Sequence, residues 1–461
     1  MHMSMGSMVA PHPHVVVIGF PFASHAVKLF RVARALAAAS PTVTFSFACT
    51  ATILARLNNV PGNIRLVEVP EADADGGEGG LGVRVWRFMA SAEAGGIKQA
   101  LQAAGGGGGK VTCVVSDALV WMAGEEAAAV AATWVPVWTG GPGGLLAHLS
   151  GDALRLGLGN GNGDGDGDEL LTSHLGLGDY RARDLPGEVV SGGPEEAMFR
   201  RIADTISKFA TAAVAFNTFQ GLVPPEVMDA LATMLPSCLT VGPFHLLPGT
   251  ESPDTDGAPA DPYGCLAWLD GHPARAVAYV SFGTIALEMT APEELCELAY
   301  GLEAAGKPFL WSLPEESWPL LPPGFMERAG AAGLGLVVPW APQVQVLRHA
   351  SVGAFVSHAG WASVLEAMSS GVPMACRPFF GDQRMNARLL HLRGLGTTLE
   401  APLTRKGVAS VVAALLSAEE GGEGMWARTQ ELRGMAATAF APGGASRNSL
   451  DKLVHIVCQR T

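Results

Sequence analysis

The chain has 461 residues, of which 48% are hydrophobic and 16% are charged, and its formal net charge is −13. This length is too great for one ordinary core, so we expect two globular domains rather than one domain or a disordered chain. The negative charge and the lack of a basic cluster disfavour nucleic acid and acidic membranes as partners.

The first residues, MHMSMGSMVAPHPH, include no basic segment before a long apolar run, so no secretory signal is predicted. The most apolar stretch, 118–138, is interrupted by Glu125 and Glu126, which argues against a membrane span. The seven cysteines are scattered without a CxxC pair and predict reduced thiols, neither disulfides nor metal ligands. We therefore expect a cytoplasmic protein that inserts into no membrane and acts as a monomer.

Short β-branched runs alternate with Ala- and Leu-rich helical patterns in the first half of the chain, which is typical of parallel βαβ units. The pattern predicts strands at residues 15–20, 43–48, 65–69, 111–116, 134–138 and 212–217. It predicts helices between them, such as 26–39 and 124–132. The fold class indicated is α/β, with a Rossmann-like, doubly wound sheet.

A Pro-, Gly- and Asp-rich segment at 248–262 interrupts this alternation and is predicted to be a linker. The alternation then resumes, with predicted strands at 276–282, 308–313, 335–339, 353–357 and 372–376 and helices at 292–305 and 361–370. We therefore expect an N-terminal domain at 1–247, the linker, and a second domain at 263–440. A C-terminal helix at 441–461 is expected to pack back on the first domain. Two such domains enclose a cleft between the carboxyl ends of their strands, where ligands bind.

Two Gly-rich inserts, near 105–110 and 157–168, are predicted to be surface loops. The second is acidic, but it lacks the terminal glutamate of an EF-hand, so no metal site is expected. The chain also contains neither GxGxxG after the first strand nor GxxxxGK[ST], which removes the main support for dinucleotide or P-loop binding.

Two titratable residues fall at the ends of neighbouring predicted strands in the first domain. The sequence GFPFASHA places His25 at the start of the first helix, and CVVSDALVW leaves Asp117 at a strand end. A histidine there can accept a proton from a bound hydroxyl, while a carboxylate holds its other ring nitrogen. Ordinary helix capping is the structural alternative for both residues.

The 44 residues from Trp340 to Gln383 resemble the donor-binding box of plant family 1 glycosyltransferases, which begins with WAPQ, contains HxGW and ends in DQ. FPFASHA, VPVWT, YVSFGT and RPFFGDQ extend the resemblance along the chain, towards the anthocyanidin and flavonol 3-O-glucosyltransferases of grasses. The resemblance implies a GT-B fold, UDP-glucose as donor substrate, a flat aromatic acceptor, and neither a metal nor another cofactor.

The matched residue types suit a UDP-sugar. The indole of Trp340 can stack on uracil, and Glu366 can accept both ribose hydroxyls. The helix predicted from 361 points its positive N-terminus at the pyrophosphate. The predicted UDP-glucose contacts are Ser24, Thr139, Thr284, Trp340, Ala341, Gln343, His358, Trp361, Ser363, Glu366, Asp382 and Gln383.

Some of these roles come from the resemblance alone. It assigns Thr139 to the glucose 6-hydroxyl and Ser24 to the diphosphate, and it links Gln383 together with Trp361 to glucose rather than galactose. Taken singly, Trp340 and Trp361 also fit core aromatics, Glu366 fits a solvated helix face and Asp382 fits a turn.

The predicted acceptor contacts are Phe22, His148, Phe379 and Phe380, which suit a flat ring system. Three positions depart from the family pattern. Ala362 stands where most members have the Asn of HCGWNS, which predicts donor binding weaker by about 1 kcal/mol. Ala23 and Pro186 replace a Ser and a Gln that flavonoid enzymes often carry, which weakens the acceptor assignment.

The hypothesis from sequence is an inverting glucosyltransferase in which His25 is the general base and Asp117 orients it. The acceptor hydroxyl of first choice is the 3-hydroxyl of a flavonol or anthocyanidin, followed by other phenolics, hormones or xenobiotics. A UDP-sugar epimerase or hydrolase, and a nucleotide-sugar-binding protein without activity, stay open as alternatives.

Overall fold

The computed structural model describes residues 13–71, 81–106, 110–158, 167–192, 194–249, 261–283, 289–417 and 419–459. Thr284 lies outside the described residues, as do 250–260 of the predicted linker and 159–166 of the acidic insert. The backbone of Ser24 belongs to a described helix, but its side chain also lies outside the description.

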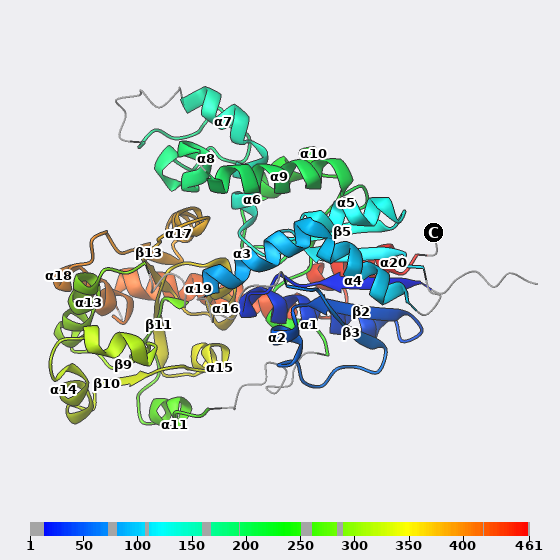
Figure 1. Cartoon of the computed structure of the whole chain (residues 1–461). Helices are drawn as coiled ribbons and strands as arrows, with labels where there is room; N and C mark the ends of the chain where they lie inside the picture. Colours follow the sequence, from blue (N-terminus) through cyan, green and yellow to red (C-terminus); the bar gives the residue numbers. More distant parts are fainter. Residues whose placement is uncertain are drawn as a thin grey trace, which may run out of the picture.

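Two parallel sheets organise the described residues (Figure 1). The first contains β1 (His14–Ile18), β2 (Thr44–Cys49), β3 (Ile64–Glu68), β4 (Cys113–Asp117), β5 (Thr133–Trp138), β6 (Val214–Phe216) and β7 (Cys238–Thr240). The second contains β8 (Val277–Ser281), β9 (Phe309–Ser312), β10 (Gly335–Val338), β11 (Val352–Ser357), β12 (Met374–Cys376) and β13 (Gly396–Thr398).

Both sheets have the same connectivity. The strand orders are β3-β2-β1-β4-β5-β6-β7 and β10-β9-β8-β11-β12-β13, so each sheet reverses its winding beside its first strand. Ligands of doubly wound sheets bind at the carboxyl ends of the strands at this reversal. The predicted α/β class with two doubly wound sheets is therefore confirmed.

Helices cover both sheets. The first half of the chain forms α1 (Ala23–Ala39), α2 (Ala51–Leu54), α3 (Leu81–Ser91), α4 (Ile97–Gly105), α5 (Met122–Ala129), α6 (Pro142–Leu149), α7 (Gly151–Leu158), α8 (Gly187–Ser191), α9 (Pro194–Phe209) and α10 (Pro225–Met234). The second half forms α11 (Cys265–Asp270), α13 (Pro292–Ala305), α14 (Phe325–Ala331), α15 (Gln343–Arg348), α16 (Trp361–Ser370), α17 (Gln383–Leu392), α18 (Arg405–Leu415), α19 (Glu420–Thr438) and α20 (Ala445–Val457). Shorter helical turns are η1 (Ala92–Gly96), η2 (Ala182–Asp184), η3 (Phe244–Leu246) and η5 (Glu315–Leu320).

The predicted helices at 292–305 and 361–370 coincide with α13 and α16. The predicted strand at 212–217 is shorter in the structure, where β6 covers only Val214–Phe216. Strands β7 and β13 were not predicted, because three residues are too few to show an alternating pattern.

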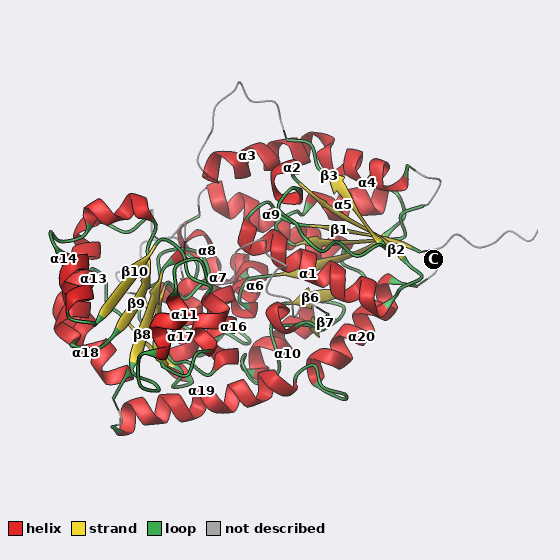
Figure 2. Ribbon diagram, turned by 90° about the horizontal axis from the view of Figure 1, so that it is seen from below, coloured by secondary structure: helices red, strands yellow, loops and turns green. Residues whose placement is uncertain are grey.

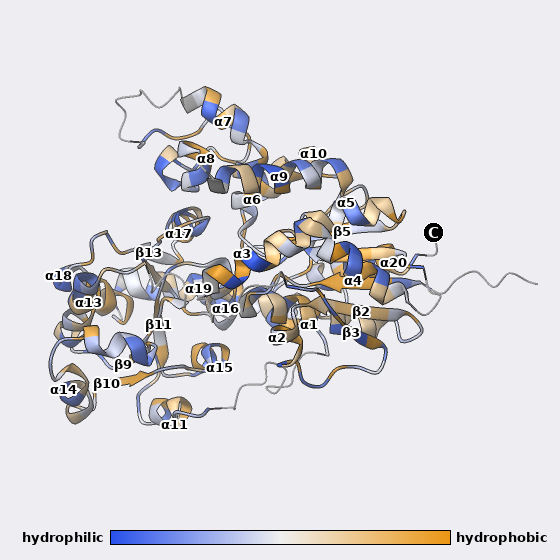
Figure 3. Ribbon diagram, in the orientation of Figure 1, coloured by the Kyte–Doolittle hydropathy of each residue, from blue (hydrophilic) through white to orange (hydrophobic). Residues whose placement is uncertain are grey.

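Side chains of the first sheet alternate between two apolar layers, as the two-residue period of a strand requires. Val15 and Val17 of β1 face the layer that includes α1 and α20, whereas Val16 and Ile18 face the opposite layer. Both layers are apolar, because a parallel sheet is covered by helices on both faces. Figure 3 shows the strands of this sheet in the hydrophobic colours.

The last helices bring the chain back to the first sheet. Helix α19 runs along the molecule from the second sheet towards the first, and α20 follows it (Figure 2). Leu450, Leu453 and Val457 of α20 are buried in the layer that also holds Val15. The Ser446 hydroxyl donates to the Gly242 carbonyl oxygen at 2.7 Å. The first sheet therefore completes its core with residues from the end of the chain.

All seven cysteines are free thiols, and four of them are buried. Among the described helices, none combines the length and apolar character that crossing a membrane requires. Within the described ranges, no three His, Cys, Asp or Glu side chains are grouped as metal ligands would be.

Candidate active site

Three adjacent strands of the first sheet carry the site residues of the N-terminal half. His25 lies in the first turn of α1, which follows β1, and Asp117 is the last residue of β4. Thr139 directly follows β5. Because β1, β4 and β5 are neighbours in a parallel sheet, their carboxyl ends bring the three side chains to one edge.

The side chains are in contact. Nδ1 of His25 lies 2.8 Å from Oδ2 of Asp117, and the carboxylate is buried while the imidazole is 26% exposed. A carboxylate accepts only, so the proton on Nδ1 donates to it, and Nε2 is the ring nitrogen that can take a proton from a ligand. Oδ1 of Asp117 also accepts the backbone N–H of Leu119 at 3.0 Å, so this residue holds both the histidine and the turn after β4.

The hydroxyl of Thr139 lies 3.1 Å from Nδ1 of His25. The sequence predicted that Thr139 contacts UDP-glucose, but it did not indicate this contact with the histidine. On the other side, the rings of Phe20 and Phe22 have their centroids 5.7 and 6.1 Å from that of His25. Phe22, predicted to contact the acceptor, thus lies beside the imidazole.

Three adjacent strands of the second sheet form the opposite edge. Gly283 follows β8, His358 follows β11, and Asp382 follows β12 by six residues. A Cβ at Gly360 would stand 2.3 Å from Nε2 of His358, so a larger residue at this position of HAGW would displace the imidazole. Helix α16 begins at the next residue, and its N-terminal amides carry the positive end of the helix dipole.

His358 lies at this helix start. Burial, with a smaller contribution from the charge of Lys28, lowers the pKa of His358 to about 4. The imidazole is therefore neutral near pH 7 and can interact with a phosphate through an N–H without carrying a charge.

Three predicted donor-box residues, Gln343, Ser363 and Glu366, form one hydrogen-bonded group. The side-chain amide of Gln343 donates to Glu366 at 2.7 Å and to the Ser363 hydroxyl at 3.2 Å. The Tyr279 hydroxyl donates to the amide oxygen of Gln343 at 3.2 Å and so fixes its orientation. Trp340 is 41% exposed, which leaves an indole face for stacking, and Ala341 beside it is buried.

Asp382 reaches across to the first half of the chain. Its Oδ2 accepts the backbone N–H of Gly141 at 2.6 Å. Burial raises the pKa of Asp382, and the hydrogen bond from Gly141 opposes that effect. The amide oxygen of Gln383 accepts the backbone N–H groups of Phe379 and Phe380 at 2.8 and 3.3 Å, so Gln383 braces the turn before α17.

Trp361 is placed differently from the other donor-box residues. Its side chain is only 3% exposed, and its indole N–H donates to the carbonyl oxygen of Asn217 at 2.7 Å. Asn217 directly follows β6 of the first sheet. Trp361 therefore joins the two halves of the molecule, and this contact favours an indirect influence on a bound sugar.

The predicted acceptor residues are spread over several elements. Phe379 packs edge-to-face on Phe282 at 5.8 Å and under the guanidinium of Arg377, while Phe380 is exposed. His148, in α6, stacks on Phe199 with ring centroids 4.2 Å apart. Burial lowers the pKa of His148 to about 4, although Glu188 lies 3.7 Å from its Nε2.

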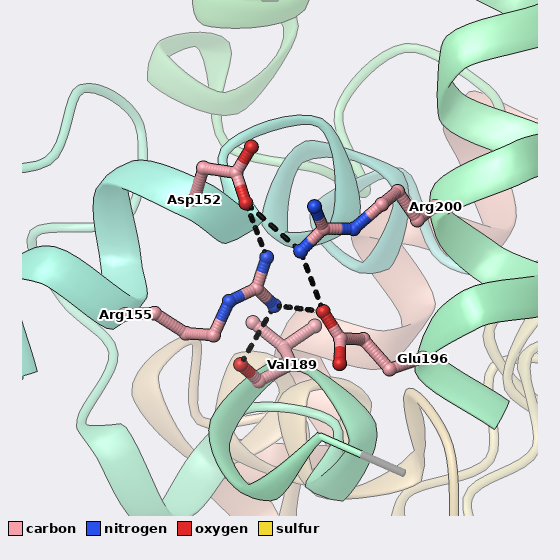
Figure 4. A network of polar contacts seen from close by, with 5 residues as sticks. All are labelled: Asp152, Arg155, Val189, Glu196 and Arg200. Carbon is pink, nitrogen blue, oxygen red and sulfur yellow. Dashed lines mark hydrogen bonds and ion pairs between the residues drawn. The ribbon is translucent and has the colours of Figure 1, made fainter. Parts of the chain in front are cut away.

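Figure 4 shows a network of ion pairs formed by Asp152, Arg155, Glu196 and Arg200. These residues line the same pocket as His148. Arg155 of α7 contacts Asp152 and Glu196, and Arg200 of α9 contacts the same two carboxylates. Arg155 also donates to the carbonyl oxygen of Val189 in α8. Exposed ion pairs add little stability singly, but a shared network fixes how the three helices lie against one another.

Besides Tyr279, sequence reasoning missed three residues of this site: Gly141, Asn217 and Asn386. Asn386 is buried in α17 and donates to the carbonyl oxygen of Ala359 at 3.0 Å. Each of the three acts through contacts between segments far apart in the chain. A local motif carries no signal for such contacts.

Comparison with known proteins identifies the family. The family model described as UDP-glucoronosyl and UDP-glucosyl transferase matches residues 17–423. The chain is 54% identical to an anthocyanidin 3-O-glucosyltransferase of Zea mays, with 98% of each chain covered, and 55% identical to one of Hordeum vulgare, with 98% of this chain and 100% of the relative covered.

Among solved structures, a UDP-glucose: anthocyanidin 3-O-glucosyltransferase in complex with UDP is similar, with a TM-score of 0.87 and 30% identity. The match covers 97% of this chain and 99% of that one, and it confirms the expected GT-B fold. The family match spans most of the chain, from β1 to α19. The protein is therefore a member of the UDP-glucuronosyl and UDP-glucosyl transferase family, as the donor box predicted.

Proposed function

We propose that this protein transfers glucose from UDP-glucose to the 3-hydroxyl of an anthocyanidin or flavonol, with inversion at the sugar C1. The observation that carries the proposal is the chain of contacts across the two sheet edges. Asp382 bonds to Gly141, two residues after Thr139, whose hydroxyl touches His25. A hexose held by Asp382 therefore stands close to the imidazole. Relatives at 54 and 55% identity carry the name anthocyanidin 3-O-glucosyltransferase.

In the proposed reaction, Nε2 of His25 removes the proton of the acceptor hydroxyl. The oxygen forms a bond to C1 from the face opposite UDP, while the bond from C1 to the phosphate oxygen breaks and UDP leaves with the electron pair. Asp117 stabilises the imidazolium, which is the usual role of a buried carboxylate behind a catalytic histidine.

The donor is held by the second half of the chain. Trp340 stacks on uracil next to Ala341, and Glu366, braced by Gln343, accepts the ribose hydroxyls. The remaining proposed donor contacts are His358, Ser363, Thr284 and Ser24 at the diphosphate, and Asp382, Gln383 and Thr139 at the glucose. The N-terminus of α16 and the neutral His358 favour the charge that develops on UDP, and no metal is invoked in this scheme.

On the acceptor side we propose that Phe22, His148, Phe379 and Phe380 line the space for the flat rings. The choice of glucose over galactose is assigned to Gln383, with Trp361 acting through its contact with Asn217. We further propose a cytoplasmic, monomeric enzyme with domains at 1–247 and 263–440, a linker at 248–262, and the segment 441–461 docked on the first domain.

Incubation of the protein with UDP-glucose and cyanidin, quercetin, kaempferol or a non-flavonoid phenol tests the proposal. We expect mass spectrometry to find a monoglucoside of the flavonoids, and NMR to show a β-linkage at the 3-oxygen. Free glucose or an isomerised nucleotide sugar without a glucoside would instead support a hydrolase or an epimerase. A glucoside formed only on the non-flavonoid phenol would shift the acceptor class.

A further inference from the structure

Asn386 carries one of three buried side-chain amides among the described residues, with Asn217 and Gln383, and it lies where three segments meet. Its side chain is in α17 and is 3% exposed. The amide nitrogen donates to the carbonyl oxygen of Ala359 at 3.0 Å, and the side chain also hydrogen-bonds to the carboxylate of Asp382. Because both partners are acceptors, the two N–H groups of an amide suit this position.

The partner at Ala359 has an unusual backbone. Ala359 has a φ of 61°, in the left-handed region that non-glycine residues rarely adopt. It lies between His358 and Gly360, directly before α16. Residues in such strained conformations persist only when surrounding contacts hold them. The Asn386 hydrogen bond is one such contact, so Asn386 supports the turn that leads into the diphosphate-facing helix start.

The third segment comes from the first half of the chain. A Cβ at Gly141 would stand 2.4 Å from Oδ1 of Asn386 and 3.2 Å from Oδ2 of Asp382. A side chain at position 141 would displace the Asn386 amide, whereas the glycine lets the Gly141 N–H reach the Asp382 carboxylate. Asn386 is thus packed between the backbone of Gly141, the turn at Ala359 and the carboxylate of Asp382.

We propose that Asn386 is a positioning residue that fixes the Asp382 carboxylate against Gly141 and the turn at Ala359, and that the hexose subsite takes its shape from this three-way contact. This inference rests on the proposed function, in which Asp382 holds hydroxyls of the donor sugar. Since Asn386 contacts Asp382 directly and reaches the helix start only through the turn at Ala359, its loss weakens the binding of UDP-glucose more than that of UDP.

The test compares Asn386→Ala and Asn386→Ser with the wild-type protein, using calorimetric affinities for UDP and UDP-glucose and the ratio of transfer rates with UDP-glucose and UDP-galactose. The expected result is UDP affinity within about twofold of wild type, kcat/KM for UDP-glucose reduced at least about tenfold, and a smaller preference for glucose. Asn386→Ser keeps one donor and provides a milder variant if Asn386→Ala does not fold.

Asn63→Ala is the matched control. The Asn63 side-chain amide also donates to a backbone carbonyl, that of Ala37, at 3.1 Å, and both residues lie away from the sheet edges described above. We expect this variant to keep the glucose preference of wild type. An equal loss of UDP and UDP-glucose affinity in the Asn386 variants, or a lower melting temperature with unchanged donor selectivity, would overturn the proposal.

The affinity measurements test this inference independently of the proposed function. If the wild-type protein binds UDP-glucose but glucosylates no acceptor, the proposed function fails, and the difference between UDP and UDP-glucose affinities still decides the role of Asn386. If transfer occurs and Asn386→Ala is indistinguishable from wild type, only the inference fails.

Discussion

The carboxyl edges of the two sheets share one strand order, yet they carry different kinds of chemistry. At the first edge, His25 and Asp117 are in direct contact, and the imidazole is open to a ligand. At the second edge, Gln343 braces Glu366, Gln383 braces its own turn, and a buried neutral histidine stands at a helix start. The same topology thus supplies the proposed reactive pair on one side and the proposed donor-binding surface on the other, and the few residues after each strand decide which.

The largest effect is expected from the reactive pair. His25→Ala removes the proposed base, and general base catalysis contributes about 100- to 10,000-fold, so kcat falls by that order. UDP affinity is expected to stay near the wild-type value, because the proposed donor site lies at the other edge. Steady-state rates and calorimetry check both expectations. Asp117→Asn keeps the shape of the side chain and is expected to lower kcat less. Wild-type turnover in His25→Ala would contradict the role of His25 as the base.

Acidification tests a feature found in both halves of the chain, a histidine whose pKa is lowered by burial. Burial lowers the pKa of His148 and of His358 to about 4, from an ordinary value of 6.5. Between pH 6.5 and about 4 the unfolded chain takes up these protons and the folded protein does not, so the free energy of unfolding falls as the pH drops. One pKa unit corresponds to about 1.4 kcal/mol, which gives a loss on the order of a few kcal/mol.

Denaturant titrations at several pH values measure this loss, and His148→Leu provides the control. Because the variant lacks one imidazole whose pKa burial lowers, its unfolding free energy depends less steeply on pH than that of wild type. An identical slope in the variant would mean that His148 is protonated equally in both states.

The two tryptophans of the donor box are expected to act differently, Trp340 in UDP binding and Trp361 in the contact between the two halves of the molecule. Stacking of a base on an aromatic ring is worth about 1–3 kcal/mol, so Trp340→Ala should weaken UDP binding about 5- to 150-fold without changing stability. Trp361→Phe deletes the hydrogen bond to Asn217 and should instead lower stability by about 1 kcal/mol. Calorimetry and thermal denaturation of both variants check this division, which the reverse pattern would contradict.

The smallest expected effect is a gain. Ala362→Asn introduces a side-chain amide in the first turn of α16, as in the HCGWNS pattern of the plant family 1 glycosyltransferases that the donor box resembles. One additional hydrogen bond of about 1 kcal/mol would raise UDP affinity about fivefold. Titration calorimetry with UDP measures it, and an affinity equal to or below wild type would show that the turn already satisfies the phosphate through backbone amides.

The sequence was most informative where the site residues lie in one continuous segment of the chain. The donor box is one segment of 44 residues, and β-branched runs located its strands to within one or two residues because each run is buried on both faces. The same rule predicts His25 and Asp117 at neighbouring strand ends, as the structure has them. Periodicity and strand order depend on nearby residues, so they can be predicted from the sequence.

Contacts between the halves were not predictable in this way. Trp361 was predicted to contact the donor, but the hydrogen bond from its indole N–H to Asn217, 144 positions earlier, was not indicated by any motif. Gly141 matters because Asp382 and Asn386 approach its Cα, and nothing near Gly141 in the sequence indicates that approach. The acceptor side is assembled from α1, α6 and the segment after β12, so its shape depends on tertiary packing rather than on any motif.

The return of α20 to the first sheet has a consequence for protein synthesis. About 200 residues separate β7, the last strand of that sheet, from α20, and translation at about 5–20 residues per second needs on the order of tens of seconds to make them. Until then the ribosome holds a nascent domain whose apolar layer around Val15 lacks its last helix. Such a surface is a natural substrate for chaperones, and truncation within α20 would expose it permanently.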